Sequence, residues 1–576
     1  MSDYSYLTNV PIERPPDSPG GGADGGPSFQ LMTRPPTKTL NQIILEVTDS
    51  YVSSLYPPYP LPEEIEVDLV SESAKACKAY NYTKPLNKVK VPTELFPAQI
   101  AAVMLKRYSI VRITAGDGAD PDCDLLAIYQ EEGPNEGIYV TDEGTFKQRI
   151  KELCYTITQT NLTATMELIR IDAPRRKRTT EKDLVPVNNG IFDFATKVLL
   201  DFDPMYIFLS KSRVNYNSSA KNEVIYNPLD NTYWDVESWM EELSDDYEIV
   251  DVLWEVLSAI VRPFVRWGKA AWFYSNTGNN GKGTLCELMR SLCGEGSYSS
   301  ISLADMGKEF YLEQLPRANA IICDENNVGT FIDKAANLKA IITNDVITIN
   351  RKKKSIISYQ FRGFMVQCLN EPPRVKDKSD SFYRRQLFIP FEKCFTGKER
   401  KYIKDDYLHR PEVLEYVLYR VLHMNFYELS EPAACRDALE EYKEYNDPVR
   451  QFMDEMSPQF AWDLLPFSFL FALYQAWFKK NNPSGIIQGK HMFISDLLHI
   501  LKDYPDWYCQ GKSVSIRPGH RMDKKEYLIR DYDLRDWQNP VYTGQDPDKI
   551  CDPKLKSSYY GLLRAPAVPT AIEEED

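Results

Sequence analysis

The stretch "YSNTGNNGKGT", residues 274–284, decides the fold of the centre of this chain. The usual phosphate-binding loop reads G-x-x-x-x-G-K-[ST], and its backbone N–H groups surround phosphates. Counted back from Gly281 and Lys282, the first glycine position holds Asn276, and Gly283 stands where a hydroxyl residue normally follows the lysine. The question is whether this altered loop still binds a nucleotide.

The sequence on both sides of the loop favours a nucleotide site. A short apolar strand precedes it, and "GTLCELMRSLCG" follows with a helical stripe of apolar residues. Strand, glycine-bearing loop and helix is the order that brings phosphates to a helix N-terminus. Thr284 lies one residue after the standard Mg²⁺-binding hydroxyl. The alternative is a Gly/Asn turn before a core helix. The predicted nucleotide contacts are Asn276, Gly278, Asn280, Gly281, Lys282, Gly283 and Thr284.

Two later apolar strands end in polar residues. "AIICDE" ends in Asp324 and Glu325, which we expect to bind Mg²⁺ and to orient the attacking water, respectively. "FMVQCLN" ends in Asn370, which would contact the γ-phosphate, although a simple strand-end turn is the alternative. Strands that alternate with helices predict a parallel α/β core.

An arginine pair precedes a further apolar strand in "SDSFYRRQLFIPF". An arginine supplied to a neighbouring subunit's phosphate is a recurrent part of such ATPases. We therefore predict that Arg384 or Arg385 is this finger, with Arg384 preferred, and a plain surface pair as the alternative.

Composition limits the function classes. The 576 residues are too many for one core. The 11 cysteines form no C-x-x-C pair and the 5 histidines no metal-like spacing, which argues for a reducing compartment without a disulfide framework or zinc site. Because no apolar run approaches the roughly 18 residues of a membrane span, we expect a cytoplasmic protein without a membrane partner.

The net charge of −15 speaks mildly against a nucleic-acid binder, but the basic residues are clustered. Each cluster alone is most simply a solvated face. The clusters are "PRRKR" at 174–178, "NRKKK" at 350–354, "KYIK" at 401–404 and "RMDKK" at 521–525.

Pattern changes predict a multidomain α/β protein. A hairpin is expected over 185–202, one helix over 236–263, an amphipathic helix over 466–480 and a basic β-ribbon over 507–522. The predicted divisions are a Pro/Gly-rich tail (1–40), an α+β region (41–200), a helical collar (201–268), an ATPase domain (269–425) and a helical C-terminal domain (426–576).

The motifs together resemble a known family. In order they are "NTGNNGKGT", "IICDE", "KAIITNDVITINRKKK", "LNEPP" and "FYRRQLFIPF". This series resembles superfamily 3 helicases, and among them the phage and mobile-element primase-helicases related to the poxvirus nucleoside-triphosphatase/primase. Replication initiators of pathogenicity islands belong to the same group. The resemblance covers about residues 90 to 425.

The resemblance implies an AAA+-like P-loop ATPase domain that uses ATP and Mg²⁺ and forms a homo-hexamer in the cytoplasm of a bacterial host cell. It also implies that the basic run is the tip of a hairpin in a central channel, where Lys352, Lys353 and Lys354 grip one DNA strand. The C-terminal domain would be winged-helix-like, with 507–525 as its wing, and would bind origin duplex DNA.

The sequence thus predicts an ATP-dependent hexameric DNA helicase that initiates replication of a phage or mobile element on single-stranded and forked DNA. Primase activity is not expected, because the acid-rich stretch "DGADPDCD" at 117–124 is not a D-x-D inside an apolar strand. A ring ATPase that remodels or loads protein partners is the alternative. A small-molecule kinase is a third class.

Overall fold

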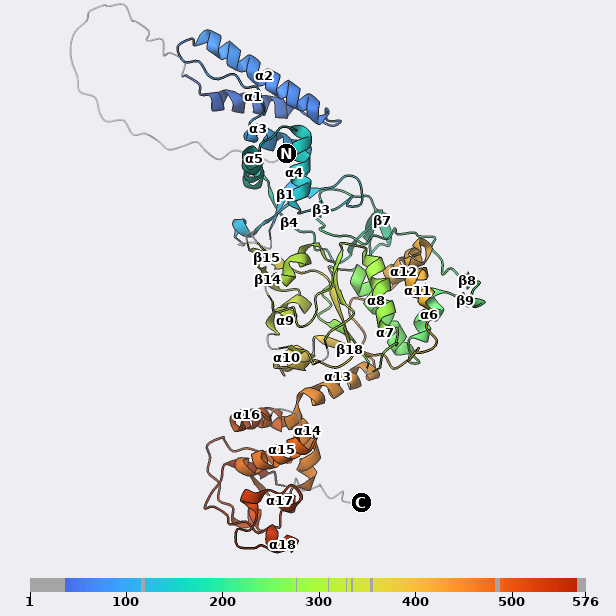
Figure 1. The fold of residues 1–576 in the computed structure, drawn as a ribbon, viewed down its shortest axis with the longest axis vertical. Coiled ribbons are helices and arrows are strands. Elements are labelled where there is room, and N and C mark those ends of the chain that lie inside the picture. Colours follow the sequence, from blue (N-terminus) through green and yellow to red (C-terminus); the bar gives the residue numbers. More distant parts are fainter. Residues whose placement is uncertain are drawn as a thin grey trace, which may run out of the picture.

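The computed structural model describes residues 37–114, 120–275, 277–308, 310–327, 329–332, 335–352, 356–481 and 487–566. Most of the predicted tail, together with Asn276, Lys353 and Lys354, lies outside these ranges. Figure 1 shows an elongated arrangement with N-terminal helices at one end, a central α/β domain and C-terminal helices at the other end. No helix in the described part of the chain is both long and apolar enough to cross a membrane.

The N-terminal part combines helices with a small sheet of order β3-β2-β1-β4. Its core is formed by apolar residues such as Leu69, Ile100, Ile128 and Ile169. The helices are α1 (Leu40–Ser54), α2 (Pro62–Thr83), α3 (Pro97–Arg107), α4 (Glu143–Leu153) and α5 (Gln159–Asp172). The strands are β1 (Ile110–Thr114), β2 (Leu125–Tyr129), β3 (Tyr139–Val140) and β4 (Arg175–Lys177).

Antiparallel strands and two helices connect this part to the central domain. The hairpin predicted over 185–202 is confirmed, with β5 (Leu184–Val187) paired to β6 (Gly190–Asp193) and β6 paired to β7 (Val198–Leu200). A second hairpin joins β8 (Ile225–Asn227) and β9 (Thr232–Trp234). The helices α6 (Val236–Glu242) and α7 (Tyr247–Val261) follow.

The prediction of a single helix over 236–263 is wrong, because the helical backbone is interrupted between α6 and α7. Asp246 caps the second helix, since its carboxylate accepts a hydrogen bond from the Glu248 N–H at 2.9 Å. Aspartate at such a position satisfies an otherwise unpaired N–H group and favours a new helix start.

The central domain is built on a five-stranded parallel sheet of order β11-β12-β16-β10-β18. The parallel α/β core predicted from the strand and helix pattern is confirmed. The strands are β10 (Ala270–Tyr274), β11 (Tyr298–Ser299), β12 (Ala320–Cys323), β16 (Phe364–Leu369) and β18 (Gln386–Pro390). The short strands β13 (Phe331–Ile332) and β17 (Arg374–Val375) form a separate parallel pair. The helices are α8 (Lys282–Cys293), α9 (Ala336–Ile342), α10 (Asp380–Tyr383), α11 (Lys401–Asp405) and α12 (Pro411–His423).

Helices cover both faces of this sheet, so its strands are buried on both sides, as parallel sheets usually are. Ala271 and Phe273 of β10 belong to one hydrophobic cluster, while Ala270 and Trp272 belong to another on the opposite face. The first cluster includes most of α7, a helix that is apolar almost all round and correspondingly buried. Helix α7 is therefore part of the central core and not a separate collar.

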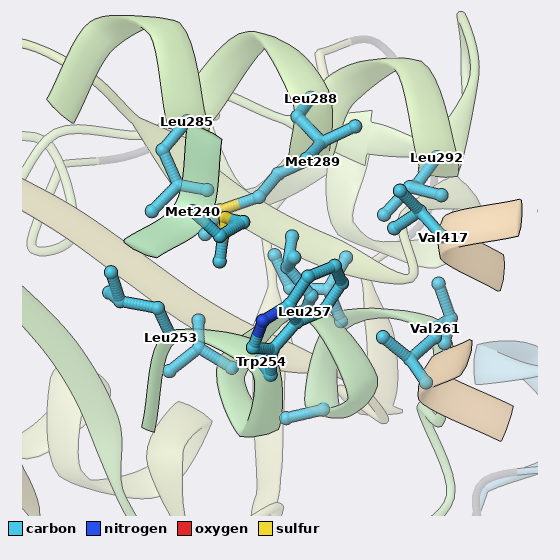
Figure 2. Close-up of a cluster of buried hydrophobic side chains, with 14 of the residues drawn as sticks. Met240, Leu253, Trp254, Leu257, Val261, Leu285, Leu288, Met289, Leu292 and Val417 are labelled. Carbon is cyan, nitrogen blue, oxygen red and sulfur yellow. The ribbon is translucent and has the colours of Figure 1, made fainter. Parts of the chain in front are cut away.

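Figure 2 shows how α8 is fixed on this core. The predicted stripe Leu285, Leu288, Met289 and Leu292 points toward α7, and all four side chains are buried. Leu253, Trp254, Leu257 and Val261 of α7 face the stripe, with Met240 and Val417 at its edges. The position of α8, and hence of the loop before it, depends on this packing.

Between β12 and β16 the chain forms the hairpin that the resemblance implied. Strands β14 (Val346–Ile349) and β15 (Ile357–Gln360) pair antiparallel. Strand β15 contacts the turn Pro121–Cys123 of the N-terminal sheet. The base of the hairpin therefore lies against the N-terminal part, as Figure 1 also shows.

Helix α13 (Ala433–Asn446) packs along β18, and the Tyr442 hydroxyl donates to the Pro373 carbonyl at 2.8 Å. The boundary predicted at 425 therefore falls inside the central packing unit. The next hydrophobic cluster begins at Val449. It contains α14 (Pro448–Met456), β19 (Leu464–Pro466), α15 (Phe467–Asn481), α16 (Lys490–Ile500), β20 (Trp507–Tyr508), α17 (Leu528–Asp531), α18 (Pro547–Ile550) and β21 (Gly561–Arg564).

The amphipathic helix predicted over 466–480 is confirmed as α15, but the β-ribbon over 507–522 is wrong. Only Trp507–Tyr508 is a strand, and it pairs with β21. Ile516 makes one isolated bridge to Tyr559, and Gly519–Met522 forms a turn of 3-10 helix. Pro518 cannot donate to a strand ladder, so the pairing does not continue beyond the Ile516 bridge.

The packing of α7 on α8 gives a stability prediction. Leu257 is fully buried, so Leu257→Ala should lower the free energy of unfolding of the central domain by about 2–5 kcal/mol. Urea titration measures this change. The control is Asp251→Ala on the same helix, where an exposed residue is removed and the change should stay within about 0.5 kcal/mol. Equal losses for the two variants would contradict this account of the core.

Candidate functional site

The loop between β10 and α8 has a backbone that requires glycine at its end. Gly281 caps α8 with φ of 88°, in the left-handed region. A Cβ atom there would lie 2.6 Å from Cδ2 of Leu243, so any other side chain would also clash. The Asn279 carbonyl accepts a hydrogen bond from the Phe395 N–H at 2.7 Å. The loop is thus held from both sides, by the end of α6 and by the segment after β18.

The loop leaves space next to its backbone at the N-terminus of α8. No described residue has an atom within 4 Å of a Cβ built on Gly278, and at Gly283 the nearest atom is Nζ of Lys404 at 4.0 Å. Asn280 is buried, and its Oδ1 accepts from the Lys282 N–H at 3.5 Å. Accessible backbone N–H groups at a helix N-terminus are suited to an anion.

Lys282 directs its ammonium group to the end of the neighbouring strand β16. Its Nζ donates to the Leu369 carbonyl and to Oδ1 of Asn370, each at 3.1 Å. The side chain is buried, and this burial lowers the pKa of the ammonium group. No carboxylate among the described residues forms an ion pair with Lys282. Its charge is therefore stabilised by neutral oxygen atoms alone, and an anionic ligand would add a favourable interaction.

The two carboxylates after β12 have different surroundings. Oδ1 of Asp324 forms an ion pair with Nη2 of Arg290 on α8 at 2.9 Å. Arg290 also contacts Glu287 at 3.3 Å. Glu325 is exposed. Because β10, β12 and β16 run parallel, Lys282, Asp324, Glu325 and Asn370 lie along the same edge of the sheet.

The structure does not bring Thr284 to Asp324. Lys282 and Cys286 lie on the face of α8 toward β16, since Sγ of Cys286 is 3.3 Å from Sγ of Cys368. Thr284 is two residues after Lys282, roughly 200° further round the helix. It lines a cavity of about 340 Å³ with Leu243, Phe395 and Lys404. The predicted Mg²⁺ ligands therefore lie on different sides of α8.

The same cavity extends from the loop to α11. Trp239, Leu243, Phe395 and Ile403 supply apolar side chains. Lysine and arginine side chains surround them, namely Lys398, Arg400, Lys401 and Lys404. The basic run at 401–404 is the sequence pattern that could have indicated this cavity. It lies after the last motif that resembles the family, so no role was assigned to it.

The arginine pair lies at the opposite edge of the sheet. Ala270 at the start of β10 pairs with Gln386 at the start of β18, so Arg384 and Arg385 come before the strand and not after it. Arg384 is exposed, whereas Nη1 of Arg385 donates to the Ser381 hydroxyl at 2.8 Å. Five strand residues at about 3.3 Å each separate this edge from the phosphate-loop edge. Neither arginine reaches the loop of its own chain.

Of the three predicted DNA-binding lysines, the described part of the chain contains Lys352. It is exposed beside the β14–β15 hairpin, and its backbone N–H is 3.5 Å from Oε2 of Glu313. Lys353 and Lys354 lie outside the described residues.

Family comparisons cover much of the chain in separate pieces. Residues 127–243 match a family described as "D5 N terminal like", and residues 444–539 match one described as "Poxvirus D5 protein-like". Two separate parts of the chain are therefore similar to D5-like proteins. Between the two, residues 273–385 match a "Family of unknown function (DUF5906)", which spans the loop, the carboxylates, the hairpin and the arginine pair.

These two matches confirm the resemblance to proteins related to the poxvirus D5 protein. It points to a replication-related enzyme that acts on nucleotides. The fold of the chain is a multidomain α/β arrangement.

The solved structures that match this chain are only distantly similar to it. A structure described as "The A form apo structure of NrS-1 C terminal region-CTR" is 14% identical and covers 70% of this chain and 86% of that one, with a TM-score of 0.36. The corresponding structure of residues 305–718 covers 82% of this chain and 100% of that one at 14% identity, with a TM-score of 0.39. The comparison with curated proteins gives no match.

An exposed cysteine lies beside the loop between β10 and α8. All eleven cysteines fall within the described residues, and Cys394 alone is exposed, with its Sγ 3.8 Å from the Gly278 carbonyl. A hydrogen bond from Thr396 lowers the pKa of the Cys394 thiol. Because the thiolate is the reactive form, Cys394 should be alkylated fastest at neutral pH. Peptide mapping after brief iodoacetamide treatment measures this, with Cys394→Ser as the control. Faster labelling of another cysteine would contradict the exposed position beside the loop.

Proposed function

We propose that this D5-like protein is an ATP-dependent DNA helicase of superfamily 3, with an AAA+-like P-loop domain, that assembles as a homo-hexamer. It would initiate replication of a phage or mobile element in the cytoplasm of a bacterial cell, acting on single-stranded and forked DNA. The observation that carries the proposal is the pair of 3.1 Å hydrogen bonds from Lys282 Nζ to the Leu369 carbonyl and Asn370. These bonds bring a buried cation next to the Asn370 amide, at the edge of the sheet where a nucleotide's phosphates would bind.

The residues present fit ATP. The left-handed backbone at Gly281, the open space at Gly278 and the buried Lys282 ammonium form a site for the β- and γ-phosphates. The cavity beside Thr284 offers apolar side chains for the base and lysines for the remaining phosphate charge. The substitutions Asn276 and Gly283, which depart from the usual pattern, leave this arrangement of Lys282 and Gly281 in place.

Mg²⁺ fits the site through fewer protein ligands than the sequence suggested. Mg²⁺ usually keeps several waters and takes one or two carboxylates together with substrate phosphates. Asp324 would hold it, with Arg290 fixing the carboxylate from the other side. The ion would neutralise charge on the phosphates. Thr284 stays a predicted ligand that would have to act through water or a rearranged helix start. Glu325, exposed and one residue further on, would orient the attacking water.

The position of Arg384 supports action between subunits. It is exposed at the edge of the sheet opposite to its own phosphate loop, so in a ring it would reach the loop of a neighbour. Arg385 is engaged locally by Ser381 and would hold the turn before β18. This division of roles favours Arg384 as the finger.

Two features support DNA as the partner. The hairpin β14–β15 carries the basic run 350–354. The C-terminal unit has the element order α14, β19, α15, α16, β20, β21, with β21 between the other two strands, an order that favours a winged-helix-like domain. The segment between β20 and β21 would be its wing and would include the exposed Lys512, Arg517 and Lys524. A protein-remodelling ATPase has no need of either feature.

The nucleotide site predicts two distinct defects. Lys282→Ala should abolish ATP binding and hydrolysis, because among the described residues of the loop Lys282 alone brings a cation to the sheet edge where the β- and γ-phosphates would bind. Glu325→Gln should bind ATP but hydrolyse it at least about 100-fold more slowly, since the general-base contribution alone is commonly 10²–10⁴. Steady-state phosphate release and filter binding of labelled ATP measure both.

The control for this experiment is Lys75→Ala on α2, an exposed lysine remote from the loop, which should hydrolyse ATP normally. Near-normal turnover of Lys282→Ala would refute the P-loop assignment. Hydrolysis without any stimulation by single-stranded DNA, with Glu325→Gln inactive, would favour the protein-remodelling alternative.

The arginine pair predicts complementation between subunits. Arg384→Ala should lose ATP hydrolysis roughly 1000-fold, but a mixture with Lys282→Ala protein should recover part of it, because each chain supplies what its neighbour lacks. Phosphate release from mixed and unmixed proteins measures this. Arg385→Ala is the matched comparison and should show a lowered Tm instead. Failure of the mixture to recover activity, with ring assembly intact by light scattering, would count against a finger acting between subunits.

A further inference from the structure

Two arginines from distant parts of the chain line one pocket at the base of the hairpin. Arg178 follows β4 and Arg362 precedes β16, and the exposed Arg266, which precedes β10, lies close enough to add positive charge. Arg362 is only 9% exposed. Burial, together with the positive charges of Arg266 and Arg178, lowers the pKa of the Arg362 guanidinium. Arg178 and Arg362 are thus like charges that are partly or wholly removed from water, and the exposed Arg266 adds positive charge nearby.

Within the described residues these arginines lack counter-charges. Arg178 Nη1 donates to the Tyr359 hydroxyl at 2.6 Å, and Arg362 Nη2 donates to Oε1 of Gln360 at 2.8 Å. Nε and Nη2 of Arg178 and Nε of Arg362 are buried without a hydrogen-bond partner among the described atoms. No described carboxylate forms an ion pair with Arg178, Arg266 or Arg362. Buried N–H donors of this kind normally have a hydrogen-bond acceptor, so these unpaired donors point to a bound ligand.

A pocket of about 280 Å³ opens beside these donors. It is lined by Arg178 and Arg362 together with Lys177, Ser358 and Thr180. Since one water takes up roughly 30 Å³, the pocket has room for a phosphate group and several waters. It lies between the N-terminal sheet and β15, next to the basic hairpin, as the neighbouring positions of β4 and β15 in Figure 1 show.

Aromatic packing accounts for only part of this arrangement. The Arg178 guanidinium lies 5.5 Å from the ring centre of Phe264 and 5.9 Å from that of Tyr359. Ring faces attract a cation but do not accept the in-plane N–H groups. Guanidinium groups have the planar, forked donor geometry that matches phosphate oxygens.

We propose that Arg178 and Arg362 form a phosphate-binding site, and that its ligand is a backbone phosphate of the DNA strand held by the hairpin. The identity of the strand rests on the proposed function, whereas the phosphate chemistry rests on the pocket alone. A phosphate there would join the N-terminal sheet to the base of the hairpin, so strand binding would fix the two parts relative to each other. The basic run "PRRKR" then has a role that its sequence alone does not indicate.

The test compares the full-length wild-type protein with Arg178→Gln/Arg362→Gln. Affinity for a fluorescent oligothymidine, measured by anisotropy over a salt series, should fall roughly tenfold, and the salt slope should fall by about one. The control Lys75→Gln/Lys78→Gln removes the same charge from exposed positions on α2 and should leave both values unchanged. Equal affinity and slope in the arginine variant would overturn the assignment to the strand.

A second measurement tests the phosphate site separately from the source of its ligand. Without ligand, Arg362→Gln should raise the Tm, because repulsion is relieved, and it should lose the extra stabilisation that inorganic phosphate gives the wild type over chloride at equal ionic strength. A lowered Tm with unchanged phosphate response would overturn the site. A phosphate response lost in the variant, with strand affinity unchanged, would assign the site to free phosphate. If the wild type hydrolyses no ATP and binds no strand, the proposed function fails, and the phosphate arm still decides the site.

Discussion

The central domain depends on one buried cation, the Lys282 ammonium. A charge removed from water is costly unless polar atoms surround it. Here the Leu369 carbonyl accepts hydrogen bonds both from Lys282 Nζ at 3.1 Å and from the Ser275 N–H at 3.2 Å. Tyr274 and Leu369 are register partners on adjacent parallel strands. The hydrogen bond that stabilises the lysine is thus available only when β10 and β16 pair in this register and α8 is seated on α7.

This constraint links the nucleotide site to the rest of the molecule. The residues at the carboxyl edge of the sheet face the site, while the arginine pair at the other edge faces away from it. The hairpin leaves the same sheet between β12 and β16, and its base rests on the N-terminal part. In the proposed ring, a change at the γ-phosphate sensed by Asn370 would pass along β16 to Arg362 and the hairpin base, eight to ten residues away along the chain.

Much of this arrangement follows from the sequence, because the loop, the strand ends and the α8 stripe are local patterns. The residues of the loop predicted the turn at Gly281. The apolar runs that end in Asp324 and Asn370 predicted the ends of neighbouring strands. Thr284 was predicted to bind Mg²⁺ because it lies close to Lys282 along the chain. The direction of its side chain depends instead on its position around helix α8, which turns it toward Phe395.

Other features have no local signal. The pocket lined by Arg178 and Arg362 joins residues nearly two hundred positions apart, and only the tertiary fold brings them together. The same holds for α13, whose Tyr442 packs on the central sheet although the composition changes before it. The break between α6 and α7 was detectable in principle from the capping Asp246, but the continuous apolar period concealed it.

A structure of the protein with Mg²⁺ and a non-hydrolysable ATP analogue tests the central claim most directly. The account predicts that Lys282 Nζ and Asn370 lie within hydrogen-bonding distance of the β- and γ-phosphate oxygens, that Asp324 lies beside the ion, and that the base occupies the cavity next to Leu243 and Phe395. Phosphates bound elsewhere, with Lys282 still donating to the Leu369 carbonyl and Asn370, would contradict it.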